Sequence, residues 1–252
     1  YRALGRILTV ATANKIHSSL ARVIETLSSV EAIQENAVAG QLMKFRNAQG
    51  TSKEPPLVIV VSSLSGGSGS AMIQDVCDML RSFHAEANFD GQHTGAFLYT
   101  ADVFKSLGIF GAAPGSIATT SELINSLHRT ESPWTEKEWN RLGVKAAVPN
   151  ASGRGPAMIF PVGASVNGVR FGREPEDVYR GFSRMIAPIF ADPNVQENYA
   201  SEFILVRRRT LASSDNLASP DNTALSDDPI TGKTGFAHFV GWGSATLSMG
   251  RD

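Results

Sequence analysis

A run of apolar residues followed by a loop of small residues constrains this chain more than any other stretch. Leu57 to Val61 are five consecutive apolar residues, and residues 62–70 are glycine and serine apart from Leu64. A run without alternation is typical of a strand buried on both faces, as in the centre of a parallel sheet. The pattern after residue 70 is helical, so we predict a strand–loop–helix unit.

The helix predicted at 71–83 has an apolar face and a polar face. Its polar face carries Asp75, Asp78 and Arg81, and its apolar face carries Met72, Ile73, Val76, Leu80 and Phe83. Further strands are expected at 95–100 and 157–162, and further helices at 3–46, 116–129 and 177–190. Polar loops are expected at 47–56 and 211–235, and 238–249 is strand-like. This alternation predicts an α/β fold with a mainly parallel sheet flanked by helices.

Composition excludes some classes of function. The net charge is −1 and the isoelectric point is about 6.6, whereas non-specific nucleic-acid or anionic-membrane binding needs an excess of Lys and Arg. The basic run 207–209 follows four apolar residues and is interpreted as a solvated strand end. The five histidines lack metal-ligand spacing, so no transition-metal site is expected.

The sequence also bears on compartment and completeness. The single cysteine, Cys77, allows no internal disulfide and suits a reducing compartment. No apolar run reaches the about 18–20 residues of a membrane span, and no secretory leader is visible. We therefore expect a cytoplasmic protein. Because the chain begins at Tyr1 rather than Met and stops abruptly at Asp252, we expect a piece of a longer protein.

The small-residue loop has a direct chemical use at the start of a helix. The first N–H groups of a helix lack internal partners, and the helix dipole places partial positive charge there. Glycines let the backbone approach an anion closely, and phosphate is the usual ligand. Ser65, Ser68 and Ser70 would add hydroxyl donors. Two alternatives stay open: a tight turn in which glycine only permits positive φ, and Ser70 acting as a helix N-cap.

Other loop templates fit less well. A Walker A loop would need a Lys after the glycines, and the dinucleotide fingerprint would need glycine where Met72 stands. The segment 66–70 partly resembles a nucleophile elbow, which would make Ser68 a hydrolase nucleophile. The downstream histidines stand in no recognisable context. Residues 231–234 lack the first Walker A glycine and a preceding strand, so they are interpreted as surface loop.

Residues 64–71, with the sequence LSGGSGSA, resemble the phosphate-binding T4 signature of the tubulin/FtsZ superfamily, G-G-G-T-G-[ST]-G. Residues 1–6 resemble the start of the helix after the T3 loop of that family. Asp102 to Gly108 resemble a T5 region, and residues 171–189 resemble the start of the central helix. Residues 243–252 are most similar to divergent bacterial tubulin-like proteins of actinobacteria.

The resemblance implies a domain organisation. Residues 1–190 would form a tubulin/FtsZ-like nucleotide-binding domain that lacks its N-terminal strands, with the central helix at about 175–190. Residues 191–252 would form a loop-rich connection and the start of a second domain.

The resemblance also implies a site for GTP or GDP with Mg²⁺. The phosphates would lie on Ser65, Gly66, Gly67, Ser68, Gly69 and Ser70. Asn167 and Glu176 would contact the base. From the residues alone, Asn167-Gly168 is equally a turn signal, and Glu176 is equally an acidic residue favoured in a first helical turn, after Pro175 at the helix start.

By the same resemblance the protein would self-associate head to tail as a homo-oligomer or filament, and the next subunit would complete GTP hydrolysis. The acidic residue for that step is not identified: Asp227 and Asp228 are candidates, as are Asp192 and Glu197. Ser65 and Ala71 replace the first and last glycines of the signature, which leaves hydrolysis open. Two alternative functions are a nucleotide-free scaffold of the same fold and a serine hydrolase that uses Ser68.

Overall fold

The computed structural model describes residues 2–27, 58–83, 94–109, 111–128, 136–144, 155–156, 158–166, 168–172 and 174–191, with single residues or pairs at 29, 31–32, 34–35 and 195. Several predicted features therefore lie outside the described residues. They are Asn167, Asp192, Glu197, Asp227, Asp228, and the segments 47–56, 207–209, 211–235 and 238–249.

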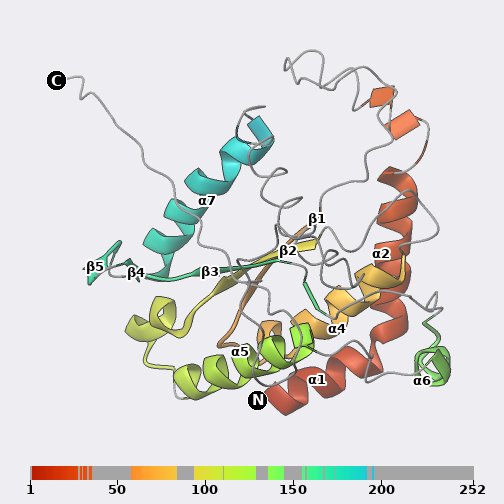
Figure 1. Cartoon of the computed structure of the whole chain (residues 1–252), viewed down its shortest axis with the longest axis horizontal. Helices are drawn as coiled ribbons and strands as arrows, with labels where there is room; N and C mark the ends of the chain where they lie inside the picture. Colours follow the sequence, from red (N-terminus) through yellow and green to blue (C-terminus); the bar gives the residue numbers. More distant parts are fainter. Residues whose placement is uncertain are drawn as a thin grey trace, which may run out of the picture.

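A parallel sheet of three strands forms the centre of the described structure (Figure 1). Its strands are β1 (Val58–Ser63), β2 (Thr94–Tyr99) and β3 (Met158–Val162), in the order β1-β2-β3. This confirms the predicted strands and the parallel α/β architecture.

The prediction that the first strand is central and buried on both faces is wrong for the described sheet. Within it β1 is an edge strand, its residues are half-buried, and Val61 is 48% exposed. The central strand is β2, whose residues 94–98 are all buried. An apolar run identifies a strand with much buried surface, but it does not fix the order of strands in the sheet.

The two faces of the sheet carry separate cores. On one face Ala96, Leu98 and Ile159 pack with Ile73 and Cys77 of α4 (Gly69–Ser82) and with Leu123 of α5 (Ala112–His128). On the other face Phe97 and Phe160 pack with Phe182 and Ile189 of α7 (Pro175–Ala191). The alternation along β2 follows from the two-residue period of a strand. Figure 1 shows α7 on one side of the sheet and α4 and α5 on the other.

The predicted helix at 3–46 is interrupted at Thr12 into α1 (Arg2–Ala11) and α2 (Ala13–Leu27). The Thr9 hydroxyl donates to the Gly5 carbonyl at 2.9 Å, and the Thr12 hydroxyl donates to the Leu8 carbonyl at 2.7 Å. Such side-chain bonds to carbonyls one turn earlier bend helices, which accounts for a break at this point.

Both α1 and α2 pack on α4, and none of its residues 69–80 is exposed. The polar face predicted for this helix, which carries Asp75, is not open to solvent at that residue. Asp75 is 2% exposed because α1 covers it. An amphipathic pattern locates the most apolar face of a helix, but it does not exclude a second element over the polar face.

The remaining described elements lie outside the three-stranded sheet. They are the 3₁₀ helix η2 (Ala101–Leu107), the helix α6 (Glu136–Arg141), and the antiparallel hairpin of β4 (Ser165–Val166) and β5 (Val169–Arg170). Gly168, in the hairpin turn, has φ +80°. This value supports the interpretation of the sequence Asn167-Gly168 as a turn signal.

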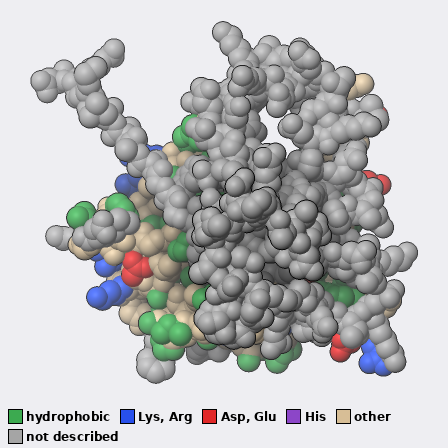
Figure 2. Space-filling view, in the orientation of Figure 1, with side chains coloured by type: hydrophobic (Ala, Val, Ile, Leu, Met, Phe, Trp, Pro, Cys, Tyr) green, Lys and Arg blue, Asp and Glu red, His purple; other side chains and the backbone are tan. Residues whose placement is uncertain are grey.

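Large apolar side chains are exposed on α1 and α5 and near the end of η2, among them Leu4, Ile7, Leu8, Leu107 and Ile117. Figure 2 shows hydrophobic side chains along the lower edge of the molecule, where these elements lie. None of the helices in the described part of the chain combines the length and the hydropathy that a membrane crossing requires.

Candidate functional site

Three loops leave the sheet at one edge. In the parallel register Ser63 of β1 is level with Tyr99 of β2, and Tyr99 is level with Val162 of β3. The glycine loop follows β1, η2 follows β2, and the hairpin that leads to α7 follows β3. The carboxyl ends of parallel strands are where ligands bind in open α/β sheets, so this edge is the candidate site.

Hydrogen bonds hold both ends of the glycine loop. The Leu64 N–H donates to the Tyr99 carbonyl at 2.9 Å, and the Ser65 N–H donates to Ser63 Oγ at 3.0 Å. At the other end the Ser68 carbonyl accepts the Ala71 and Met72 N–H groups, each at 3.1 Å. The loop is therefore anchored to β2 at its start and continues into the first turn of α4.

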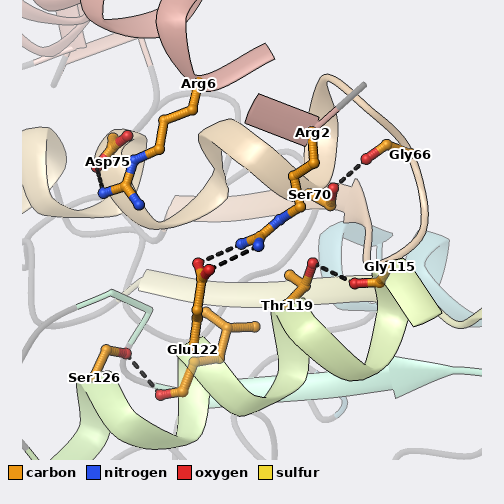
Figure 3. A network of polar contacts seen from close by, with 10 residues as sticks. Arg2, Arg6, Gly66, Ser70, Asp75, Gly115, Thr119, Glu122 and Ser126 are labelled. Atoms are coloured by element: carbon orange, nitrogen blue, oxygen red, sulfur yellow. Dashed lines mark hydrogen bonds and ion pairs between the residues drawn. The ribbon is translucent and has the colours of Figure 1, made fainter. Parts of the chain in front are cut away.

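Ser70 lies inside the first turn of α4, because this helix begins at Gly69 and is preceded by Ser68. Its side chain is buried, and its hydroxyl donates to the Gly66 carbonyl (Figure 3). Ser70 therefore closes the loop on itself and does not stand at the N-cap position. The other two predicted hydroxyl donors differ in exposure. Ser68 is exposed, whereas Ser65 Oγ is buried and has no hydrogen-bond partner among the described residues.

The middle of the loop presents unused donors. Within the described part of the chain, the backbone N–H groups of residues 66–69 donate to no acceptor. They lie at the N-terminus of a 14-residue helix, where the helix dipole adds partial positive charge. A Cβ placed on Gly66 would meet no atom within 4 Å, so the backbone is open to a ligand there. Consecutive free N–H groups of this kind form an anion-binding concavity.

The first turns of α1 lie directly on this loop. A Cβ at Gly5 would overlap the Gly67 carbonyl oxygen, so the two backbones are in contact. Arg2, one turn earlier, forms a two-pronged ion pair with Glu122 of α5, and Arg6 lies 3.4 Å from Asp75 of α4 (Figure 3). The hydrogen bond from Arg2 lowers the pKa of Glu122, although burial acts in the opposite direction.

A side-chain bridge joins the other two loops. Asp102 accepts a hydrogen bond from the Ala164 N–H at 2.8 Å and another from the Thr100 hydroxyl, which also donates to the Val162 carbonyl at 3.2 Å. These bonds tie η2 to the segment after β3. Beside them Tyr99 is packed edge-on against Tyr179, and burial, with a smaller effect of Tyr179, raises the pKa of Tyr99 to about 12.

At the start of α7 the structure separates the roles of two acidic residues. Pro175 occupies the first helical position, and the Asp177 carboxylate accepts the Glu174 N–H at 3.3 Å. Asp177 therefore caps the helix. Glu176 is exposed, as is Phe171 at 61%, so both side chains are open to a ligand at this end of the sheet edge.

Neither metal nor hydrolase chemistry is assembled among the described residues. No group of three or more His, Cys, Asp and Glu side chains that could hold a metal ion occurs among them. In the same part of the chain, the Ser68 hydroxyl has no hydrogen bond to a histidine. Of the histidines after Ser68, His84, His93 and His238 lie outside the described residues, as does the side chain of His128.

Sequence reasoning missed the residues that support the loop: Arg2, Gly5, Arg6, Asp75 and Glu122. Arg2 and Glu122 are 120 positions apart, so no local pattern joins them. One signal was present, since Arg2, Gly5, Arg6 and Thr9 recur at helical spacing and mark a face opposite to the apolar one.

Comparison with known proteins gives one match. The family described as "Tubulin like" matches residues 1–252. No curated protein and no solved structure matches the chain.

Proposed function

Because this chain belongs to the tubulin-like family, we propose that it binds a guanine nucleotide, with the phosphates on residues 65–70. The observation that carries the proposal is the row of unused N–H groups at residues 66–69, at the N-terminus of α4 and at the carboxyl edge of the sheet. A phosphate at this place would accept hydrogen bonds from the backbone without needing a lysine.

The same sheet edge supports a place for the base and the sugar. Glu176 is an exposed carboxylate at the start of α7, and a carboxylate can accept both N–H donors on the Watson–Crick edge of guanine. Phe171 supplies an exposed aromatic ring nearby in sequence. Asn167 is the second proposed base contact. In this proposal the first turn of α7, at Glu176, contacts the base, and the glycine loop contacts the phosphates.

Mg²⁺ fits this site only as a companion of the nucleotide. A hard cation prefers oxygen ligands, and in phosphate sites it is commonly held by the phosphates, water and one or two side chains. The loop offers the hydroxyl of the exposed residue Ser68, and the described residues provide no carboxylate cluster. When bound, Mg²⁺ would offset phosphate charge.

Head-to-tail self-association and GTP hydrolysis at the resulting interface are the further parts of the proposal. They are supported by membership of the tubulin-like family. The acid for hydrolysis would come from a second copy, with Asp227 and Asp228 as the candidates.

One observation favours the alternative of a nucleotide-free scaffold. The two arginines nearest to the loop are already paired, Arg2 with Glu122 and Arg6 with Asp75. Attraction for a phosphate would therefore come from backbone dipoles and not from an unpaired cationic side chain, which lowers the expected affinity.

Thermal unfolding with added nucleotide separates these functions. A ligand that binds only the native state raises the unfolding temperature by mass action. We expect GTP and GDP with Mg²⁺ to raise the unfolding temperature and ATP at equal concentration to have little effect. An unchanged unfolding temperature with every nucleotide would support the scaffold. Labelling of Ser68 by a covalent serine probe would support the hydrolase instead.

A further inference from the structure

The close approach of α1 to the glycine loop depends on a single residue. A Cβ at Gly5 would overlap the carbonyl oxygen of Gly67, and it would lie 3.0 Å from the Gly67 carbonyl carbon and 3.1 Å from Ala71 Cβ. Two of these three atoms belong to the backbone, which cannot turn aside as a flexible side chain can. Any residue other than glycine at position 5 must therefore move α1 or the loop.

This contact fixes the direction of one peptide group in the loop. The Gly67 carbonyl points at α1. In a trans peptide the N–H of the next residue points the opposite way, and the chain has no cis peptide among its described residues. The Ser68 N–H therefore points away from α1, and it donates to no acceptor among the described residues. Rotating this peptide would turn the donor inward and present a carbonyl to an incoming phosphate.

Two ion pairs hold α1 at this distance. Arg2 and Arg6 stand on either side of Gly5 in the sequence, and they bind Glu122 of α5 and Asp75 of α4 (Figure 3). The Asp75 side chain is 3% exposed and the Arg6 side chain is 42% exposed, so this ion pair is buried on the side of α4 and open to solvent on the side of α1. The helix is thus fastened to α4, which follows the loop in the chain, and to α5.

We propose that Gly5 is a positioning residue of the nucleotide site. Through Gly67, it holds the loop in the conformation that directs the Ser68 N–H to the phosphates. This inference rests on the proposed nucleotide binding. It gives α1 a role in the affinity of the loop for phosphate, and this role comes from the contact between the backbones of Gly5 and Gly67.

The test compares two substitutions of glycine by alanine within helices. Gly5→Ala places a methyl group against Gly67, whereas Gly181→Ala in α7 meets no atom within 4 Å. Both changes raise helix propensity by about the same amount, so their difference isolates the contact with the loop. We expect Gly5→Ala to weaken GTP binding by about tenfold or more, the value of one charge-assisted hydrogen bond. Gly181→Ala should bind GTP as the wild type does.

Two further readouts separate positioning from general damage to the fold. The loss of affinity should grow from GMP to GDP to GTP, because only phosphate contacts are disturbed. Without nucleotide, amide hydrogen exchange over residues 64–70 should increase in Gly5→Ala and stay unchanged in Gly181→Ala. If Gly5→Ala does not fold, Glu122→Gln loosens the Arg2 anchor and should give a smaller loss in the same direction.

The failures are distinguishable. If the wild-type chain binds no nucleotide, the proposed function fails and this inference falls with it. If the wild type binds GTP and both Gly5→Ala and Glu122→Gln bind it equally well, only the role of Gly5 is overturned. Equal losses for GMP and GTP would also overturn it, because they would indicate damage beyond the phosphate site.

Discussion

At the residue scale, Tyr99 links the core to the candidate site. It ends β2, its carbonyl accepts the first N–H of the glycine loop, and its ring packs against Tyr179 and Phe182 at centroid distances of 5.0 and 5.6 Å. These edge-on ring contacts bury the side chain, and burial opposes ionisation of its hydroxyl. Of the residues at the sheet edge, Tyr99 is therefore the one for which a pH dependence of stability can be derived.

Ionisation of the Tyr99 hydroxyl should destabilise the fold in strong alkali. Its pKa is raised from 10.0 to about 12 in the folded protein. The folded state therefore holds this proton more tightly than the unfolded state, and the associated stability is present below pH 10 and lost as the pH rises toward 12. We expect Tyr99→Phe to lose less unfolding free energy than the wild type over this range, as measured by denaturant titration. Parallel losses in both proteins would contradict the assignment.

At the element scale, β2 contributes most to the core because both of its faces are covered. Phe97 is fully buried. Its ring stacks on that of Phe160 at a centroid distance of 4.5 Å and is tilted against the ring of Phe182 of α7 at a centroid distance of 5.3 Å. The opposite face of the strand packs on α4 and α5. A cavity at Phe97 would therefore disturb the contact between sheet and helix.

Phe97→Ala should lower the unfolding free energy by about 3–5 kcal/mol, which is typical for the loss of a buried aromatic ring. The control is Ile117→Ala on α5, a residue that is 68% exposed and should change stability by about 0.5 kcal/mol or less. Denaturant unfolding measures both. Similar small effects of the two substitutions would show that Phe97 is not in a packed core.

The sequence predicted the helices and strands themselves better than it predicted what packs against them. The predicted strand at 95–100 and the predicted helix at 177–190 match β2 and α7 closely, because a continuous apolar run and an amphipathic period are local signals. The break at Thr12 and the burial of Asp75 were missed. Both depend on what packs against the helix, which a periodic pattern does not contain.

The apolar pattern of α1 shows the same limit. Leu4, Ile7 and Leu8 recur at helical spacing and identify the helix, yet they are 58%, 63% and 58% exposed. The inner face of α1 carries Gly5 and Thr9 instead, because the helix rests on a backbone loop that leaves no room for large side chains. Two backbones that come this close require small residues between them, and the hydrophobic pattern of the sequence gives no sign of such a contact.

At the scale of the whole molecule, the strand-to-helix loop was predictable and its support was not. The position of residues 65–70 between a strand and a helix follows from local sequence. The pairing of Arg2 with Glu122 and of Arg6 with Asp75 requires the tertiary fold. The base contact Asn167 and the acids Asp227 and Asp228 lie outside the described residues, so their roles stay predictions, as does the domain boundary at 190.

The central claim is that the open glycine loop binds the phosphates of a guanine nucleotide. The measurement that tests it most directly is a calorimetric titration of GTP, in Mg²⁺, into the wild-type chain and a Gly66→Trp variant. Position 66 has open space around its Cβ, so the indole should fill the ligand site without disturbing the fold. Gly181→Trp is the matched control.

We expect the wild type and Gly181→Trp to bind GTP in preference to ATP, and Gly66→Trp to lose binding while its unfolding temperature stays near that of the wild type. Equal GTP binding by Gly66→Trp would place the nucleotide elsewhere. Absence of binding by the wild type would contradict the claim and leave the loop as a structural turn of a tubulin-like scaffold.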